Sequence, residues 1–173
     1  FQHAKNRIPW LLILMFSATI TGAIITKYEN AFQVVPILVS FIPMLMDTGG
    51  NCGSQSSTLV IRGLAVDELH FSDFFSIVWK EFRVSLIVGI VLAAANGVRI
   101  YLVHGGDVQM AMVVAASLIG TIVVAKMVGC MLPIFAKQLH LDPAIMASPL
   151  ITTIVDTCSI MIYFRIATLV FRL

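Results

Sequence analysis

Long apolar stretches alternate with short polar segments along the whole chain, and this pattern predicts membrane-spanning helices. Residues 8–26 contain no charged side chain, and a helix of that length would span the roughly 30 Å hydrocarbon core of a bilayer. Five spans are predicted in this way, at about residues 8–26, 31–61, 78–100, 108–136 and 143–171. We therefore expect an all-α integral membrane protein with five transmembrane helices per subunit, and a single domain over residues 1–173.

The second predicted span has an irregular pattern. Pro36 and Pro43 interrupt it, and a polar segment at residues 47–58 follows before apolar residues return near Leu59. A continuous helix over residues 31–61 would be about 46 Å long, which exceeds the thickness of the hydrocarbon core. We therefore expect a tilt, a kink or a break in this span.

Charged and aromatic residues are mixed in the segment 62–83, which holds Phe71, Phe75 and Trp79. Aromatic rings beside charged groups are typical of the membrane–water interface. This segment is predicted to be a surface loop that leads into an interfacial helix ahead of the third span. After that span, Gly105-Gly106 predicts a tight turn.

Five spans would place the two ends of the chain on opposite sides of the membrane. With a cytoplasmic N-terminus, the inner segments 1–7, 62–83 and 137–141 carry six lysines and arginines, and the outer segments carry four. This excess agrees with the positive-inside rule. We expect a multi-pass protein of the cell's inner (plasma) membrane, with the N-terminus cytoplasmic and the C-terminus outside.

The composition supports a lipid environment, because 59% of the residues are hydrophobic and only 12% are charged. Soluble domains average about 45–50% apolar and about 25% charged residues. A net charge of +2 without a run of basic residues gives no reason to expect a nucleic-acid partner. Cys52, Cys130 and Cys158 each lie in an apolar stretch, which favours buried thiols. The chain starts at Phe1 just before a predicted span, and we expect it to be a piece of a longer protein.

Two carboxylates are predicted to lie deep in the membrane. Asp156 is 13 residues after Pro143, roughly 20 Å along a helix, and Asp47 lies at a similar depth in the second span. An ionised side chain at the bilayer centre costs about 2.5–3.5 kcal/mol even on lenient scales. Either each carboxylate is hydrogen-bonded inside the bundle or neutralised by Lys126 of the fourth span, or both face a water-filled path and attract cations.

Small and polar residues surround both carboxylates. The segment 47–58 cannot face lipid at membrane depth, so it must line a water-filled cavity or a helix interface. Gly49 and Gly53 form a GxxxG pattern, which helix packing alone would explain. Asn51 and Gln55 are four residues apart and form a polar stripe. Neutral amides, hydroxyl groups and carboxylates suit a hard, hydrated cation.

Two motifs in this chain resemble those of one family. The run Gly49-Gly50-Asn51-Cys52-Gly53-Ser54-Gln55, followed by Arg62-Gly63-Leu64-Ala65, resembles the signature of the MgtE magnesium channels. The start of the fifth span, from Asp142-Pro143-Ala144 through Thr152-Thr153 to Asp156, resembles the last helix of that family. The resemblance implies a homodimer in the lipid bilayer, with a pore lined by the second and fifth spans. It also implies that cytoplasmic regulatory domains are absent from this chain.

The resemblance assigns roles to single residues. It implies that Asp156 recognises hydrated Mg²⁺ in the pore, and that Asp142 binds Mg²⁺ together with the cytoplasmic domains. The candidate metal residues are therefore Asp156 and Asp142. The candidate pore-lining residues are Asp47, Gly49, Gly50, Asn51, Gln55, Thr152 and Thr153, of which Asp47 lies outside the family signature and is chosen for its depth and surroundings alone. No organic cofactor is expected.

The function predicted from these features is a Mg²⁺-selective channel domain. It would conduct hydrated divalent cations down their electrochemical gradient, with Mn²⁺ and Co²⁺ as further candidates. The alternative is a secondary transporter that exchanges a divalent cation for Na⁺ or H⁺, since kinked spans and midplane acids suit it equally well. The sequence holds no HExxH or GxSxG motif, so we do not expect an enzyme. A purely structural anchor would have no need for Asp156.

Overall fold

The computed structural model describes residues 2–140 and 142–172, and within these ranges the chain is helical without any strand. The long helices are α1 (Gln2–Lys27), α3 (Ile42–Ala65), α4 (Phe74–Val103), α5 (Val108–Gln138) and α6 (Pro143–Phe171). The short elements are α2 (Glu29–Val34) and the 3₁₀ turns η1 (Pro36–Phe41) and η2 (Phe71–Asp73). The predicted all-helical class is confirmed for the described residues.

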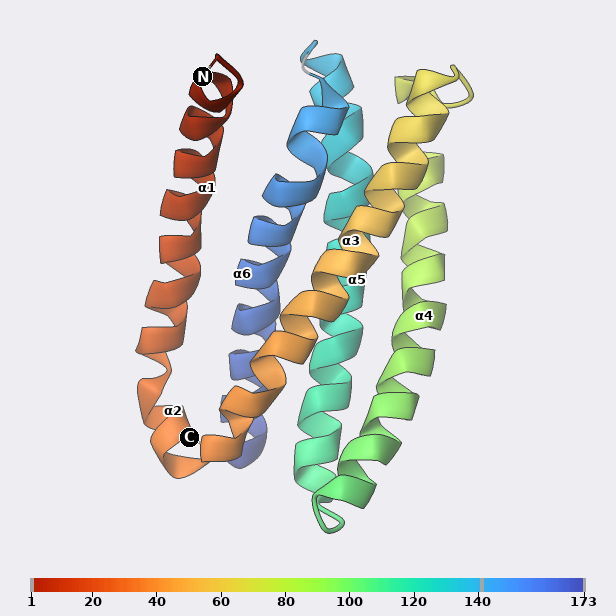
Figure 1. Ribbon diagram of the computed structural model, residues 1–173. Helices are drawn as coiled ribbons and strands as arrows, with labels where there is room; N and C mark the ends of the chain where they lie inside the picture. The colour runs from red at the N-terminus through yellow and green to blue at the C-terminus, as the bar shows by residue number, and fades with distance from the viewer. Residues whose placement is uncertain (1, 141, 173) are drawn as a thin grey trace.

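The long helices run alternately up and down the molecule (Figure 1). The start of α1, the α3–α4 connection and the α5–α6 connection share one end, and the α4–α5 turn lies at the other (Figure 1). Within the described residues, three segments are long and apolar enough to cross a membrane: Phe71–Val103, Val108–Gln138 and Pro149–Phe171. A shorter apolar helix covers Leu14–Lys27.

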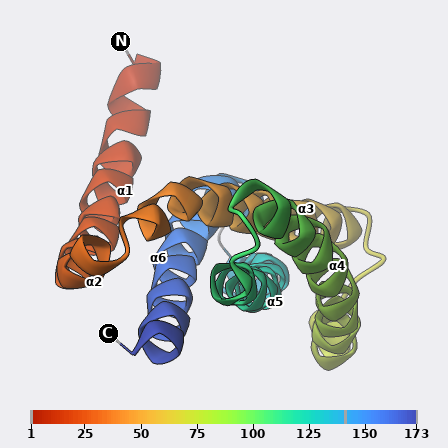
Figure 2. The same ribbon diagram turned by 90° about the horizontal axis from the view of Figure 1, so that it is seen from below.

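Helix α5 is the centre of the bundle. It packs against α3, α4 and α6, while α1 packs against α6 and extends away from the other helices (Figure 2). Buried residues occur along the whole length of α5, from Met110 to Ala136. Helix α3 also packs against α6, and residues of these two helices line a cavity that is described below.

The second predicted span is broken, which is one of the three outcomes expected from its excess length. Val35 departs from helical geometry, and Pro36 starts the 3₁₀ turn η1 because its ring fixes φ and removes an N–H donor. The hydroxyl of Tyr163 on α6 donates a hydrogen bond of 2.8 Å to the carbonyl of Leu38. Tyr28, just before α2, stacks on Phe164 with ring centroids 4.8 Å apart. Helix α6 therefore anchors the break and satisfies part of its irregular backbone.

The prediction for residues 62–83 is wrong in part. Helix α3 continues to Ala65, and α4 runs without interruption from Phe74 to Val103, so no separate interfacial helix precedes the third span. Phe75 and Trp79 belong to the first turns of α4. A helix satisfies its own backbone hydrogen bonds in water and in lipid alike, so it need not end where its side chains become polar.

The predicted tight turn before α5 is confirmed. Gly105 and Gly106 have φ angles of +66° and +87°, a conformation that glycine adopts without strain. The carboxylate of Asp107 then accepts a hydrogen bond of 2.9 Å from the backbone N–H of Met110. This N-cap satisfies one of the free donors at the start of α5.

Candidate ion-binding site

A polar cavity of about 270 Å³ lies in the groove between α3 and α6. Its lining residues come from two short stretches of the chain: Met46, Asp47, Gly50, Asn51 and Ser54 from α3, and Thr152 and Asp156 from α6. The structure thus brings together the two carboxylates that the sequence places at similar depth. They are more than one hundred residues apart in the chain.

Helical periodicity explains why these residues share one cavity. On α3, Asp47, Asn51 and Ser54 follow the i, i+4, i+7 spacing of a single helix face. On α6, Thr152 and Asp156 are four residues apart and lie one above the other. The cavity therefore forms where one polar face of α3 meets one polar face of α6.

Hydrogen bonds within the site turn oxygen acceptors toward the cavity. The amide nitrogen of Asn51 donates to Asp47 Oδ2 over 3.1 Å, which leaves the amide oxygen of Asn51 as a free acceptor. The hydroxyl of Thr152 donates to the carbonyl of Pro149 over 2.9 Å, so its oxygen also remains able to accept. Together with the carboxylates of Asp47 and Asp156, the site offers oxygen acceptors to a positively charged group.

Gly50 allows the two helices to approach at this point. A Cβ atom on Gly50 would lie 3.3 Å from Thr152 Cγ2, which is tighter than an ordinary van der Waals contact. A larger side chain would separate α3 from α6 and fill part of the cavity. Gly50 therefore contributes to the site because the absence of a side chain lets α3 and α6 lie close together and leaves the cavity open.

The structure places Gly49 outside this cavity. A Cβ atom on Gly49 would lie 2.8 Å from both Thr121 Cγ2 and Val155 Cγ1, so this glycine serves close packing of α3 against α5 and α6. Gly53 does the same, because its added Cβ would lie 2.8 Å from Ile151 Cγ2. Gly49 and Gly53 therefore lie on a face of α3 that packs against other helices, and the residues that line the polar cavity lie on a different face.

Three further candidate residues also lie away from the cavity lining. The side chain of Gln55 contacts Lys126 Nζ at 3.5 Å, so its polar group turns toward α5. The hydroxyl of Thr153 donates to the Pro149 carbonyl over 2.9 Å. Asp142 is exposed just before α6, at the end of the bundle that carries the α5–α6 connection.

Lys126 pairs with an acid other than Asp47. Only 2% of Lys126 is exposed, and its ammonium group lies 3.5 Å from Glu81 Oε2 on α4 and 3.1 Å from the hydroxyl of Ser56 on α3. Ser56 in turn donates to Glu81 over 2.7 Å. Of the alternatives left open for Asp47, neutralisation by Lys126 is therefore wrong, because Lys126 pairs with Glu81. Asp47 makes its hydrogen bond to Asn51 on its own helix.

Sequence reasoning missed Ser54, Met46 and Glu81. Ser54 was detectable, because it lies seven residues after Asp47, nearly on the same helix face. Glu81 was assigned to an interfacial segment, and no spacing rule connects it to Lys126 on another helix. The partner of Lys126 therefore became visible only in the three-dimensional structure.

Comparison with known proteins gives a consistent result over the whole chain. The family model described as the divalent cation transporter MgtE matches residues 42–166. The magnesium transporter MgtE of Bacillus subtilis is 39% identical over 168 residues, which cover 97% of this chain and 37% of that protein. The magnesium transporter MgtE of Thermus thermophilus is 35% identical over 163 residues, which cover 94% of this chain and 36% of that protein.

A third relative agrees with these two. The magnesium transporter MgtE of Enterococcus faecalis is 33% identical over 174 residues, which cover 99% of this chain and 38% of that protein. This chain therefore spans little more than a third of the length of the curated relatives that it matches.

Proposed function

Because the chain belongs to the MgtE family of divalent cation transporters, we propose that it is the membrane-spanning part of a homodimeric Mg²⁺ channel. In this proposal, α1, α3, α4, α5 and α6 all cross the plasma membrane. The N-terminus lies on the cytoplasmic side and the C-terminus outside, in agreement with the excess of basic residues in the inner segments. The transported ion is Mg²⁺, with Mn²⁺ and Co²⁺ as possible substitutes.

The observation that carries this proposal is the set of acceptors in the cavity between α3 and α6. Mg²⁺ gives up its water reluctantly and usually keeps several water molecules when it binds to proteins. The waters of a hydrated cation point their hydrogen atoms outward, so a site for such an ion must accept hydrogen bonds. The carboxylates of Asp47 and Asp156, with the free oxygens of Asn51 and Thr152, meet this requirement.

The size of the cavity agrees with a hydrated ion. Six water molecules at about 30 Å³ each occupy roughly 180 Å³, and the Mg²⁺ at their centre adds little. The cavity holds about 270 Å³, so the hydrated ion fits with some space left. A site for a dehydrated ion would instead need protein oxygens at about 2.0–2.1 Å from the metal on several sides.

A second copy of the chain would complete the pathway. Asp47 is exposed in the single chain, and the cavity opens at the surface of the bundle between α3 and α6. A two-fold axis beside this groove would place the same residues of both copies around one ion. Two Asp156 carboxylates that face each other repel, and this repulsion favours a divalent ion over a monovalent one.

Asp142 is proposed as a second, separate position for Mg²⁺. It lies exposed at the end of the bundle that this proposal places on the cytoplasmic side. There it can meet regulatory domains of the same protein, in the part of the relatives' length that this chain does not span. Mg²⁺ bound between Asp142 and these domains would couple the cytoplasmic Mg²⁺ concentration to the opening of the channel.

Ion uptake into liposomes that contain a Mg²⁺-sensitive dye tests the proposal. Asp156→Asn keeps the shape of the side chain and removes its charge. We expect Mg²⁺ uptake at least about tenfold lower, because one charge-assisted hydrogen bond is worth about 1.5–3 kcal/mol. The matched control is Glu29→Gln, which removes an exposed carboxylate at the start of α2 and should leave uptake unchanged.

The same assay separates a channel from the alternative, a transporter that exchanges a divalent cation for Na⁺ or H⁺. A channel takes up Mg²⁺ without any gradient of Na⁺ or H⁺, provided that charge can balance. An exchanger stops when the counter-ion is removed. Equal Mg²⁺ uptake and equal exclusion of Na⁺ in the Asp156→Asn and wild-type proteins would refute the proposed role of Asp156.

A further inference from the structure

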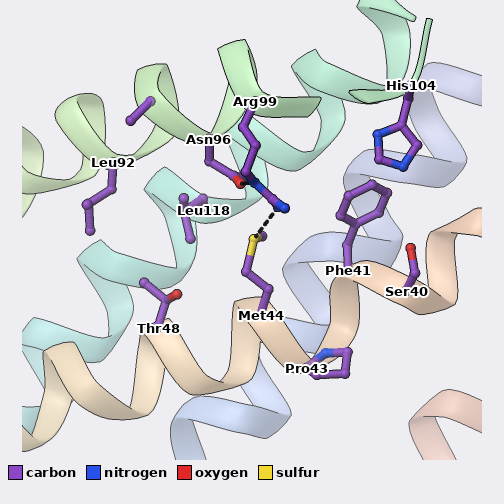
Figure 3. A pocket seen from close by; sticks show the side chains of 11 residues that line it. Ser40, Phe41, Pro43, Met44, Thr48, Leu92, Asn96, Arg99, His104 and Leu118 are labelled. Atoms are coloured by element: carbon purple, nitrogen blue, oxygen red, sulfur yellow. Dashed lines mark hydrogen bonds between the residues drawn. The ribbon is translucent and has the colours of Figure 1, made fainter. Parts of the chain in front are cut away.

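A second, larger cavity lies on a different face of the bundle, between α3, α4 and α5 (Figure 3). Its volume is about 750 Å³. Thr48 lines this cavity and Asp47 lines the ion cavity, so adjacent residues on α3 face two separate spaces. The proposed ion pathway does not pass through this second cavity.

An arginine side chain supplies hydrogen-bond donors to one part of this cavity. The guanidinium group of Arg99 donates from Nε to Asn96 Oδ1 over 2.9 Å, and one Nη lies 3.5 Å from the sulfur of Met44 (Figure 3). A thioether sulfur is only a weak acceptor, and a guanidinium group has five N–H donors. Within the described residues, the amide nitrogen of Asn96 has no hydrogen-bond partner, but it is buried and does not face the cavity. The donor that the cavity presents is therefore the guanidinium group of Arg99.

The charge of this part of the cavity is positive. Among the described lining residues, Arg99 carries a full positive charge and no carboxylate is present. A phosphate group suits these donors well, since arginine binds phosphate through two parallel hydrogen bonds. Asn96 supports this contact indirectly, because its amide oxygen accepts the hydrogen bond from Arg99 Nε and orients the guanidinium group.

The other part of the cavity is apolar. Phe41, Met44, Leu92 and Leu118 contribute hydrocarbon or thioether surface to its wall. Leu92 precedes Arg99 by two helical turns, which places it about 10 Å further along α4 toward the middle of the helix. Arg99 lies close to the end of α4, at the level expected for lipid headgroups.

We propose that this cavity binds an anionic phospholipid, with the phosphate group on Arg99 and an acyl chain along Leu92 and Leu118. A free phosphate ion would use the donors and leave the apolar wall uncovered. A zwitterionic lipid would bring a cationic group next to Arg99, where like charges repel. An anionic lipid such as phosphatidylglycerol satisfies the donors, the charge and the apolar wall at once.

Native mass spectrometry of the purified protein in detergent tests this inference. Phosphatidylglycerol and phosphatidylcholine with identical acyl chains are titrated separately, and bound lipid is counted. The wild-type protein should bind phosphatidylglycerol at least about tenfold more tightly than phosphatidylcholine. Arg99→Gln should remove this preference, because it removes the charge-assisted hydrogen bonds.

Arg165→Gln provides the matched control. Arg165 is an exposed arginine on α6 in the same half of the bundle, and it does not line the cavity. This variant should bind phosphatidylglycerol like the wild type. Asn96→Leu keeps the positive charge and removes the acceptor that orients Arg99, so we expect affinity for phosphatidylglycerol to fall severalfold while phosphatidylcholine binding stays unchanged.

Thermal unfolding separates binding from a purely structural role of Arg99. Phosphatidylglycerol should raise the unfolding temperature of the wild type and of Arg165→Gln, but not that of Arg99→Gln. An equal rise in all three proteins would overturn the proposal. Equal affinity for both lipids would also overturn it, as would displacement of phosphatidylglycerol by millimolar inorganic phosphate, which would indicate a site for small anions.

Discussion

At the scale of single residues, the account depends on the two carboxylates in the groove between α3 and α6. Asp47→Asn removes one of them and keeps its shape. We expect lower Mg²⁺ flux and a change in unfolding free energy within about 0.5–1 kcal/mol, because Asp47 is exposed and bonds only to Asn51 among the interactions described for it. Flux assays and thermal unfolding on the same preparation measure the Mg²⁺ flux and the change in unfolding free energy.

The opposite result would assign Asp47 a structural role. If Asp47 held the bundle together as part of a buried ion pair, its loss would cost about 3–5 kcal/mol and leave flux through the remaining molecules normal. The structure gives that role to Glu81, which lies 3.5 Å from Lys126. A strongly destabilised Asp47→Asn protein with normal flux would contradict the assignment.

At the scale of helices, the buried pair between Lys126 and Glu81 connects α5 to α4. Lys126→Met leaves the carboxylate of Glu81 without its partner, and we expect a loss of about 3–5 kcal/mol in unfolding free energy. The double variant Lys126→Met with Glu81→Met should recover most of this loss, since two apolar side chains can pack where the ion pair was. A double-mutant cycle measured by thermal unfolding gives the coupling between the two residues.

An exposed ion pair provides the control for this cycle. Asp67 lies 3.7 Å from Lys137, and 83% of its side chain is exposed. Asp67→Asn should therefore change the unfolding free energy by no more than about 1 kcal/mol. A similar loss for Asp67→Asn and Lys126→Met would show that burial of the Lys126 pair has no special effect.

The contact between α3 and α5 leads to a second prediction at this scale. A Cβ atom on Gly129 would overlap the carbonyl oxygen of Gly53, and a backbone atom cannot move aside as a side chain can. Gly129→Ala should therefore lower the unfolding free energy by about 1–3 kcal/mol or more, since overpacking usually costs this much. The matched control is Gly22→Ala on α1, where no atom lies within 4 Å of the added Cβ. That variant should be neutral or stabilised by about 0.5–1 kcal/mol, and equal effects of both substitutions would refute the role of this contact.

The sequence was sufficient to predict the helices, but not to predict which face of each helix contacts its neighbours. The length of the apolar stretches predicted the helical class. The prolines and the excess length predicted a tilt, a kink or a break in the second span, and the structure places a break at Val35. The approach of Asp47 and Asp156 followed from their depth. The sequence did not show which face of α3 each residue occupies. The structure packs Gly49 against α5 and α6 and turns the polar group of Gln55 toward Lys126, so neither residue lines the cavity between α3 and α6. In a membrane, apolar residues surround most helices, so the pattern alone does not fix which face meets which neighbour.

At the scale of the whole molecule, the open groove between α3 and α6 predicts a dimer. Ser54 lines the cavity, and Ser54→Cys should be joined to its counterpart by a short thiol-reactive cross-linker in a background without the native cysteines. Phe75→Cys on α4 is the control, because 82% of Phe75 is exposed and it lies away from this groove. Gel mobility should show cross-linked dimers for the first variant and monomers for the second. Efficient cross-linking through Phe75→Cys alone would place the dimer interface on another face.

The central claim is that Mg²⁺ crosses the membrane through the cavity that contains Asp47 and Asp156. The most direct measurement is the current through single planar bilayers with a Mg²⁺ gradient and no gradient of Na⁺ or H⁺. The account predicts a current that reverses at the equilibrium potential of Mg²⁺ and that is lost in the double variant Asp47→Asn with Asp156→Asn. A wild-type-like current in the double variant, or Mg²⁺ transport that requires a counter-ion, would contradict it.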